Sequence, residues 1–145
     1  MTLAPADMLC FSLYSAQQAM QAAYKPLLDP LGLTYPQYLV LTALWTQDAP
    51  QTVGALGAAL GLETNTLTPL LKRMETAGLI ARRRDAVDER QVRISLTEKG
   101  QALQPQALDV QRCFFEATGL SLTEAKQLRD QITALRDRLN PRSQL

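Results

Sequence analysis

The chain carries a cysteine and a tyrosine at a spacing that could support thiol redox chemistry. Cys10 lies in the stretch LCFSLYSAQQAM, residues 9–20, and Tyr14 follows four residues later. In a helix these two positions share a face, and a phenol can donate a hydrogen bond to a thiolate. A helix N-terminus also favours the thiolate, so Cys10 is a candidate reactive thiol. The alternative, a small buried apolar residue, is the commoner state of a lone cysteine.

The residues that are missing narrow the chemistry further. The chain has no histidine, and its two cysteines, Cys10 and Cys113, stand 103 residues apart without a C-x-x-C motif. These facts exclude the common zinc motifs and every Ser-His or Cys-His nucleophile, so we expect neither a metal nor a cofactor. A permanent structural disulfide is not expected in a reducing cytosol.

All four tyrosines fall within the first 38 residues, at Tyr14, Tyr24, Tyr35 and Tyr38. On one continuous helix, the 14 residues from Cys10 to Tyr24 correspond to about 21 Å. Tyr24 therefore cannot reach the cysteine of its own chain. If it serves that thiol, it must come from a second subunit, whereas Tyr38 is expected to pack in the core.

Length and charge indicate one globular subunit with a basic segment. The chain has 145 residues and a net charge of +1, and residues 72–93 hold seven of its 15 basic residues against four acidic ones. Such clustering favours nucleic acid as a partner, although many charge runs are only solvated faces. With no long apolar run and no signal-like N-terminus, we expect a cytoplasmic protein without a membrane partner.

The hydropathy pattern predicts helices at both ends and a helix-turn-helix between them. One helix is expected in residues 5–28, ended or kinked by Pro26, and a second in 34–47 with Thr34 as its N-cap. Residues 52–62 and 62–80 predict the two helices of the helix-turn-helix. Pro69 implies either a helix start as late as Thr66 or an opened first turn.

A β-hairpin and two more helical stretches complete the pattern. Residues 79–84 and 91–97 alternate around the polar tip DAVDER, residues 85–90, and predict a hairpin. A helical stretch capped by Thr97 and kinked at Pro105 follows, and the box Ser121-x-x-Glu124 begins the last helix. The predicted fold class is mainly α with a small β-hairpin wing. Residues 34–97 would form a winged helix-turn-helix that binds DNA, and residues 1–33 and 98–145 would form the dimerisation bundle of a single 145-residue subunit.

This order resembles the MarR family of dimeric bacterial transcription regulators. The stretch DERQVRISLTEKG, residues 88–100, resembles the wing signature of that family. LCFSLYSAQQAM, YKPLLDPLGLTYPQYLVLTALW and TLTPLLKRMETAGLI are similar to the branch that regulates organic hydroperoxide resistance. The resemblance is strong over residues 9 to about 100 and weaker in the C-terminal third.

The resemblance implies roles for individual residues. Cys10 would be the peroxide sensor, and Tyr14, Tyr24 and Tyr35 would support its sulfur. Cys113 of the partner subunit, or a small thiol in its place, would resolve the oxidised cysteine as a disulfide. The family often has a Ser-Gly pair where this chain has Thr64 and Asn65, so the operator sequence does not follow from the family.

The helix-turn-helix and hairpin predict the residues that contact operator DNA. Short polar side chains near the start of the recognition helix suit base edges or phosphates, Lys72 and Arg73 suit phosphates, and Arg90 at the wing tip suits the minor groove. Asp88 is expected to shape the turn. The complete candidate set is Thr64, Asn65, Thr66, Thr68, Lys72, Arg73, Arg84, Asp88 and Arg90.

We therefore expect a homodimeric repressor of double-stranded operator DNA that is released when an organic hydroperoxide oxidises Cys10. A regulator of the same fold that binds a small aromatic ligand, with both cysteines inert, is the main alternative. A thiol peroxidase that uses Cys10 is a second alternative, against which the basic wing argues. A purely structural helical protein is the third.

Overall fold

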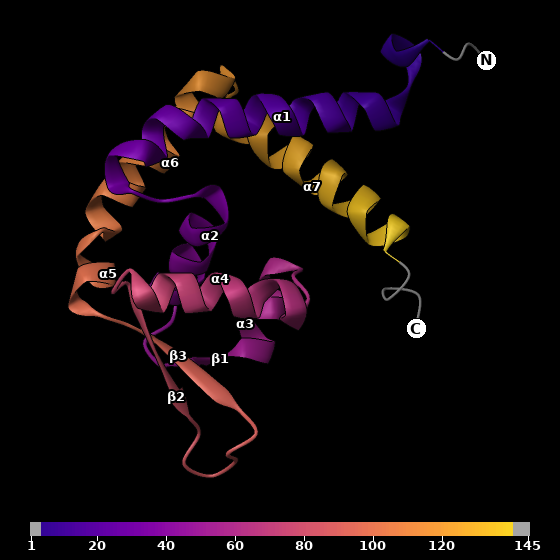
Figure 1. The fold of residues 1–145 in the computed structure, drawn as a ribbon. Helices are drawn as coiled ribbons and strands as arrows, with labels where there is room; N and C mark the ends of the chain where they lie inside the picture. The colour runs from indigo at the N-terminus through magenta and orange to yellow at the C-terminus, as the bar shows by residue number, and fades with distance from the viewer. Residues whose placement is uncertain (1–3, 141–145) are drawn as a thin grey trace. The chain divides into compact units, whose positions relative to one another are not determined.

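A computed structural model describes residues 4–140 of the chain (Figure 1). The chain divides into two compact units, the first ending at Val110 and the second beginning at Gln111. Both units are mainly helical, and the first also holds a small sheet. The elements are η1 (Pro5–Asp7), α1 (Leu9–Leu28), η2 (Asp29–Leu31), α2 (Tyr35–Trp45), β1 (Gln51–Thr52), α3 (Val53–Leu60), α4 (Thr64–Thr76), β2 (Ile80–Arg84), β3 (Val92–Leu96), α5 (Glu98–Ala102), α6 (Gln104–Thr118) and α7 (Leu122–Leu139).

Helix α1 is one continuous element of 20 residues with Cys10 as its second residue. Of the two predicted effects of Pro26, an end or a kink, the end does not occur: α1 continues to Leu28, where the predicted stretch also stops, and the Asp29 N–H closes its last turn on the Lys25 carbonyl. Proline is tolerated there because only one backbone bond is lost so near the end. A short η2 turn and Gly32, whose φ of 67° suits glycine, lead into the next helix.

Helix α2 supplies much of the core of the first unit. Thr34 caps it as predicted, in a capping box that it shares with Gln37. Val40, Leu41 and Leu44 of α2 are buried against Leu67, Leu70 and Leu71 of α4 and other apolar side chains. This packing fixes the helix-turn-helix in place.

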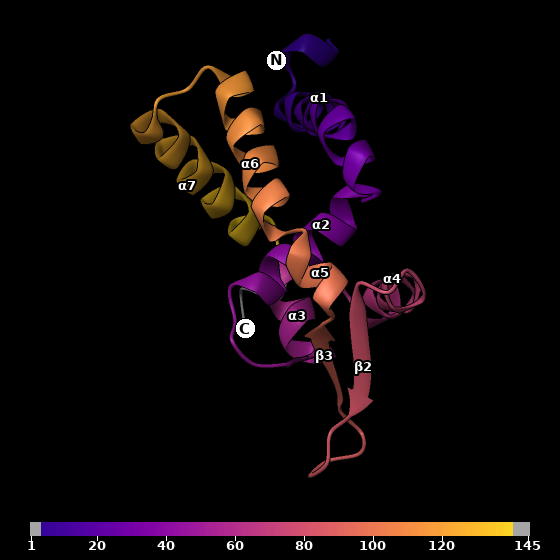
Figure 2. The same ribbon diagram turned by 90° about the vertical axis from the view of Figure 1, so that its left-hand side faces the viewer.

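Helices α3 and α4 form the predicted helix-turn-helix (Figure 2). A Cβ at Gly57 would lie 2.8 Å from the Leu62 carbonyl oxygen, so the turn requires glycine there. Of the two alternatives that Pro69 left open, the start at Thr66 does not occur, because α4 begins at Thr64, the residue at which the recognition helix was expected to begin. The Glu63 carbonyl accepts from both Thr66 N and Leu67 N, at 3.0 and 2.9 Å, which closes the first turn despite Pro69.

The hairpin is the larger part of a three-stranded antiparallel sheet in the order β1-β3-β2. Strand β1 was not predicted, because it has only two residues and pairs with the distant β3. Thr52 also caps α3 by accepting from Ala55 N at 3.1 Å. Thr97 Oγ1 donates to the Gly78 carbonyl at 2.6 Å, which ties the base of the hairpin to the end of α4.

The C-terminal stretch is broken rather than kinked. Thr97 caps α5 as predicted, by accepting from Gly100 N, but α5 ends at Ala102 and α6 begins at Gln104. Pro105 is thus the second residue of a new helix, where its missing N–H costs nothing. The predicted box of Ser121 and Glu124 begins α7. None of the described helices is long and apolar enough to cross a membrane. Residues 1–3 and 141–145 of the expected dimerisation segments lie outside the described residues.

Candidate functional site

Cys10 lies exposed in the first turn of α1, the position that the sequence predicted. Leu9 and Phe11 beside it are also exposed, so the thiol has apolar neighbours at the protein surface. Tyr14 is 58% exposed, and its hydroxyl accepts a hydrogen bond from Gln18 Nε2 at 2.9 Å. The first turn of α1 is therefore an accessible thiol site with an apolar surround.

Tyr24, Tyr35 and Tyr38 form one aromatic cluster between the end of α1 and the start of α2. The ring centroids of Tyr24 and Tyr35 are 5.0 Å apart, and Tyr38 lies 5.8 Å from Tyr24 and 6.2 Å from Tyr35. Burial, reinforced by the neighbouring phenols, raises the pKa of Tyr24 above its ordinary value, and burial also raises the pKa of Tyr35. Both hydroxyls therefore stay protonated at neutral pH and can act as donors.

An open cavity of about 610 Å³ lies beside this cluster. Tyr24 and Tyr35 line it, together with Leu28 and Leu33. Tyr38 is buried and does not line the cavity, although its ring packs against those of Tyr24 and Tyr35. The cavity thus offers phenol donors next to apolar side chains. Since Tyr24 and Cys10 belong to the same helix, 14 residues separate them, or about 21 Å. The structure does not bring these two predicted site residues of one chain together.

Cys113 is half-buried on α6, in the second unit. Phe114 and Phe115 beside it are also half-buried. Helix α7 of the same unit exposes Leu122, Leu128 and Ile132, which leaves apolar side chains uncovered along one helix. A cysteine among half-buried aromatic residues is chemically competent to form a disulfide with a thiol brought to it.

The recognition helix α4 has one apolar and one polar face. Its apolar face buries Leu67, Leu70, Leu71 and Met74. The predicted DNA-contacting residues lie outside this apolar face: Thr64, Asn65, Thr66, Lys72 and Arg73 are exposed, and Thr68 is half-buried. This polar surface has the size and chemistry that a major groove accepts.

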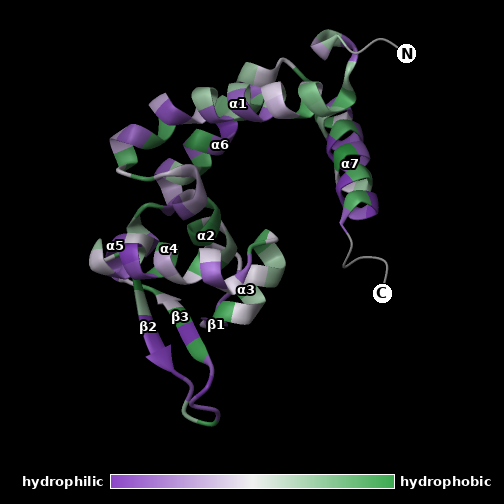
Figure 3. Ribbon diagram, turned by 45° about the vertical axis from the view of Figure 1, so that its right-hand side comes forward, coloured by the Kyte–Doolittle hydropathy of each residue, from purple (hydrophilic) through white to green (hydrophobic). Residues whose placement is uncertain are grey.

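The wing tip is polar and largely exposed, and Figure 3 colours most of the hairpin as hydrophilic. The Arg90 side chain is 91% exposed, and its Nε donates to Asp88 Oδ1 at 3.1 Å. The Arg90 backbone N–H donates to the same oxygen. Arg84 Nη1 donates to the Glu89 carbonyl at 3.0 Å. Asp88 and Arg84 therefore shape the tip, and Arg90 projects from it.

Sequence reasoning missed Asp85, which is only 9% exposed and is the one buried charged residue among those described. Its carboxylate accepts from Val87 N at 2.8 Å, Asp88 N at 3.3 Å and Arg93 Nε at 2.6 Å. The Val87 N–H, followed by Arg93, holds the pKa of Asp85 below its ordinary value. The signal was available, because an aspartate that opens a turn often accepts from the N–H two residues on.

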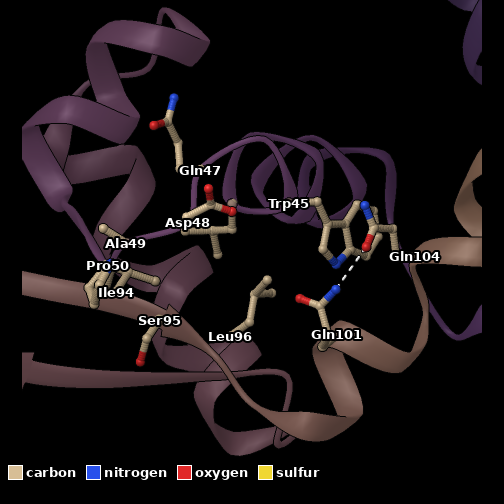
Figure 4. A pocket seen from close by; sticks show the side chains of 11 residues that line it. Trp45, Gln47, Asp48, Ala49, Pro50, Ile94, Ser95, Leu96, Gln101 and Gln104 are labelled. Carbon is tan, nitrogen blue, oxygen red and sulfur yellow. Dashed lines mark hydrogen bonds between the residues drawn. The ribbon is translucent and has the colours of Figure 1, made fainter.

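A second cavity, of about 520 Å³, lies at the base of the wing and is more polar (Figure 4). Trp45, Asp48, Gln101 and Gln104 are among the residues that line it, and Figure 4 shows Gln104 beside the Trp45 ring. Gln101 Nε2 donates to Gln104 Oε1 at 2.7 Å, and Trp45 Nε1 donates to the Gly100 carbonyl. The site has room for a small ligand with an aromatic ring.

Comparison with known proteins identifies two kinds of relative by sequence. A family model described as transcriptional regulator SarA/Rot matches residues 22–105. An organic hydroperoxide resistance transcriptional regulator of Bacillus subtilis (strain 168) is 44% identical over 137 residues, which are 94% of this chain and 92% of that protein.

Solved structures with the same fold have been determined in several states. AbfR of Staphylococcus epidermidis, reduced and bound to DNA, is 36% identical with a TM-score of 0.77, over 92% of this chain and 93% of that one. Its disulfide form gives a TM-score of 0.67 at 36% identity, over 90% of each chain. CouR of Rhodococcus jostii RHA1, bound to p-coumaroyl-CoA, is 25% identical with a TM-score of 0.79, over 92% of this chain and 95% of that one.

Proposed function

This chain belongs to the MarR/SarA family of winged-helix transcription regulators, in the branch of organic hydroperoxide resistance regulators, and we propose that it is a homodimeric repressor released from its operator by oxidation of Cys10. It is a DNA-binding regulator and not an enzyme, since its relatives are transcription regulators and one of them was solved on DNA. The redox trigger, the dimer and the residues in each role are the proposal.

The observation that carries the proposal is the placement of donor and thiol at opposite ends of α1. The Tyr24 and Tyr35 cavity lies about 21 Å along that helix from Cys10. Two α1 helices paired antiparallel would bring the Cys10 of one subunit to the tyrosines of the other. The exposed Leu9 and Phe11 would be covered by that pairing, which removes apolar surface from water.

The proposed chemistry starts with the Cys10 thiolate attacking one peroxide oxygen of an organic hydroperoxide. The attack is on the terminal O–H oxygen. The O–O bond breaks, Cys10 becomes a sulfenic acid, and the alkoxide that leaves takes up a proton from solvent to become an alcohol. The thiol of Cys113 in the partner then attacks the sulfenic sulfur, a disulfide forms and water leaves. The tyrosine hydroxyls donate hydrogen bonds to the thiolate and stabilise it. The apolar surround of Cys10 favours a lipophilic peroxide over hydrogen peroxide.

The proposed DNA complex uses both the recognition helix α4 and the wing. Each α4 would enter a major groove through its exposed polar residues, and each wing would bring Arg90 to the flanking minor groove. A disulfide between subunits would change the separation of the two α4 helices. Because operator half-sites have a fixed spacing, this change would release the DNA. The AbfR structures, with one form reduced on DNA and another disulfide-linked, support this order of events.

The test is a titration of the reduced protein with cumene hydroperoxide. Operator binding is followed by fluorescence anisotropy on a duplex selected by the reduced protein from a random-sequence pool, and subunit linkage is followed by non-reducing gels. We expect release together with a linked dimer, both abolished in Cys10→Ser. In Cys113→Ser the linkage should disappear. Release that persists in Cys10→Ser, or no release at all, would refute the redox proposal.

The cavity beside Trp45 favours a second candidate, a regulator that responds to an aromatic ligand. Its volume of about 520 Å³ and the complex of CouR with p-coumaroyl-CoA support that function. Release of the same duplex by p-coumarate or its thioester in a Cys10→Ser variant would favour it. Substitution of Trp45 by leucine should then abolish the response, while the peroxide response would be unaffected.

A further inference from the structure

The buried carboxylate of Asp85 has no role in the proposed redox switch, yet it is the most highly connected side chain of the wing. Its oxygens accept two tip N–H groups, from Val87 and Asp88, and the Arg93 guanidinium. Its own N–H donates to the Gln91 carbonyl at 2.9 Å. A charge of this kind is buried only where partners satisfy it, and here they all belong to the hairpin.

The contacts of Asp85 continue to the residue that projects from the tip. Asp85 accepts from Asp88 N, and the Asp88 carboxylate accepts from both the backbone N–H and the Nε of Arg90. On the other side, Arg93 Nη1 donates to the Pro50 carbonyl at 3.4 Å, just ahead of β1. The series of contacts thus runs from the loop before the helix-turn-helix to the wing tip.

We infer that Asp85 is a positioning residue for DNA recognition, which forms the wing tip before binding and presents Arg90 to the DNA. The six tip residues 85–90 contain no proline, so no residue of the tip has a covalently fixed φ, and order in the turn depends on its hydrogen bonds. A tip that is already ordered in the free protein loses less conformational entropy on binding. The inference rests on the proposed contact of Arg90 with DNA.

Simple electrostatics predicts the opposite sign, which makes the inference testable. Removing a carboxylate from a surface near phosphates should strengthen DNA binding. Glu89 provides the matched control. Its side chain is exposed in the same tip, and within the described part of the chain only its backbone carbonyl takes part in the tip contacts, by accepting from Arg84. Glu89→Gln removes the same charge as Asp85→Asn without touching the network.

The experiment measures the dissociation constant of the reduced protein for the selected duplex at several salt concentrations. We expect Asp85→Ala to weaken binding about three- to tenfold and Glu89→Gln to leave it equal or stronger. Asp85→Asn keeps an oxygen for the two tip N–H groups but loses the charge facing Arg93, so it should fall between. Tighter binding by Asp85→Ala, equal to that of Glu89→Gln, would overturn the inference.

A double-mutant cycle shows whether Asp85 acts through Arg90. In an Arg90→Ala background, Asp85→Ala should have little further effect, because the side chain that it positions is gone. Equal losses of affinity in both backgrounds would mean that Asp85 acts by stabilising the fold and not through Arg90. In that case thermal melts should show a lower melting temperature for both variants that carry Asp85→Ala. If Arg90→Ala alone leaves the affinity unchanged, the proposed Arg90 contact fails and the inference with it. An Arg90→Ala defect without an Asp85→Ala defect refutes the inference alone.

Discussion

Mixed dimers can show which subunit supplies the phenols to Cys10. Tyr24 lies about 21 Å along α1 from the Cys10 of its own chain, and Tyr35 packs beside Tyr24. This distance is about seven times the length of a hydrogen bond, so neither phenol can donate to that thiol. In one mixed dimer, the first chain carries Cys10→Ser and the second carries Tyr24→Phe with Tyr35→Phe. In the other, one chain carries all three substitutions and its partner carries none.

The two mixed dimers differ only in the distribution of the same substitutions. If the phenols come from the partner, the first dimer keeps one complete site and the second keeps none. If they come from the same chain, the assignment is reversed. A hydrogen bond to a charged group contributes about 1.5–3 kcal/mol, so loss of the donors should slow the oxidation of Cys10 about tenfold or more.

The assay is the rate of Cys10 sulfenic acid formation with cumene hydroperoxide, followed in tandem-purified mixed dimers with Cys113→Ser in both chains. Fast oxidation should appear only when the substitutions are on different chains. Tyr38→Phe is the matched control, since Tyr38 packs in the same aromatic cluster but does not line the cavity. Fast oxidation of the dimer with all three substitutions on one chain would refute the reasoning.

The remaining predictions concern the wing, one glycine and the phenols. Arg90→Ala should make the negative slope of log affinity against log salt shallower by about 0.9, measured by anisotropy, because one contact that neutralises a phosphate is lost. Gly100→Ala should destabilise the fold by about 1–3 kcal/mol in thermal melts, because a Cβ there would collide with the Leu79 carbonyl, whereas Gly54→Ala, with no atom within 4 Å, should not destabilise it. Burial raises the pKa of Tyr24, so above the ordinary phenol pKa of 10.0 the unfolded chain loses this proton before the folded chain does. The free energy of unfolding should therefore be unaffected by Tyr24 below that pH and should fall as pH rises above it. Denaturant melts should show this fall, and Tyr24→Phe should reduce it.

The features that are encoded locally could be predicted from the sequence. Thr34, Thr97 and Ser121 each stand at a helix start, and all three cap as predicted, Thr34 and Ser121 within a capping box. Alternation in residues 79–84 and 91–97 was enough to place β2 and β3. In these cases the deciding interaction lies within a few residues of the signal.

Long-range contacts could not be predicted in the same way. Strand β1 exists because Gln51 and Thr52 pair with Ile94 and Arg93, and no two-residue stretch carries a period. Helix α4 begins at Thr64 and buries Leu67 completely in the core, and the position of Pro69 alone did not decide between this start and one at Thr66. The candidate site followed a similar division. Cys10 and the tyrosines were proposed from residue type and spacing. Asp85 was missed although its contact with Val87 N is local, and its contact with Arg93, eight residues away, could not be inferred from spacing.

Under the proposed mechanism, the separation of Cys10 from Tyr24 along α1 would also link peroxide sensing to the amount of protein in the cell. A lone subunit would hold the two halves of a sensor at opposite ends of one helix and no complete sensor at all. The peroxide response would then appear only above the concentration at which subunits pair, so that a cell with little of this protein would neither repress nor respond. Dilution in vitro should lower the oxidation rate of each cysteine, and not only the occupancy of the operator.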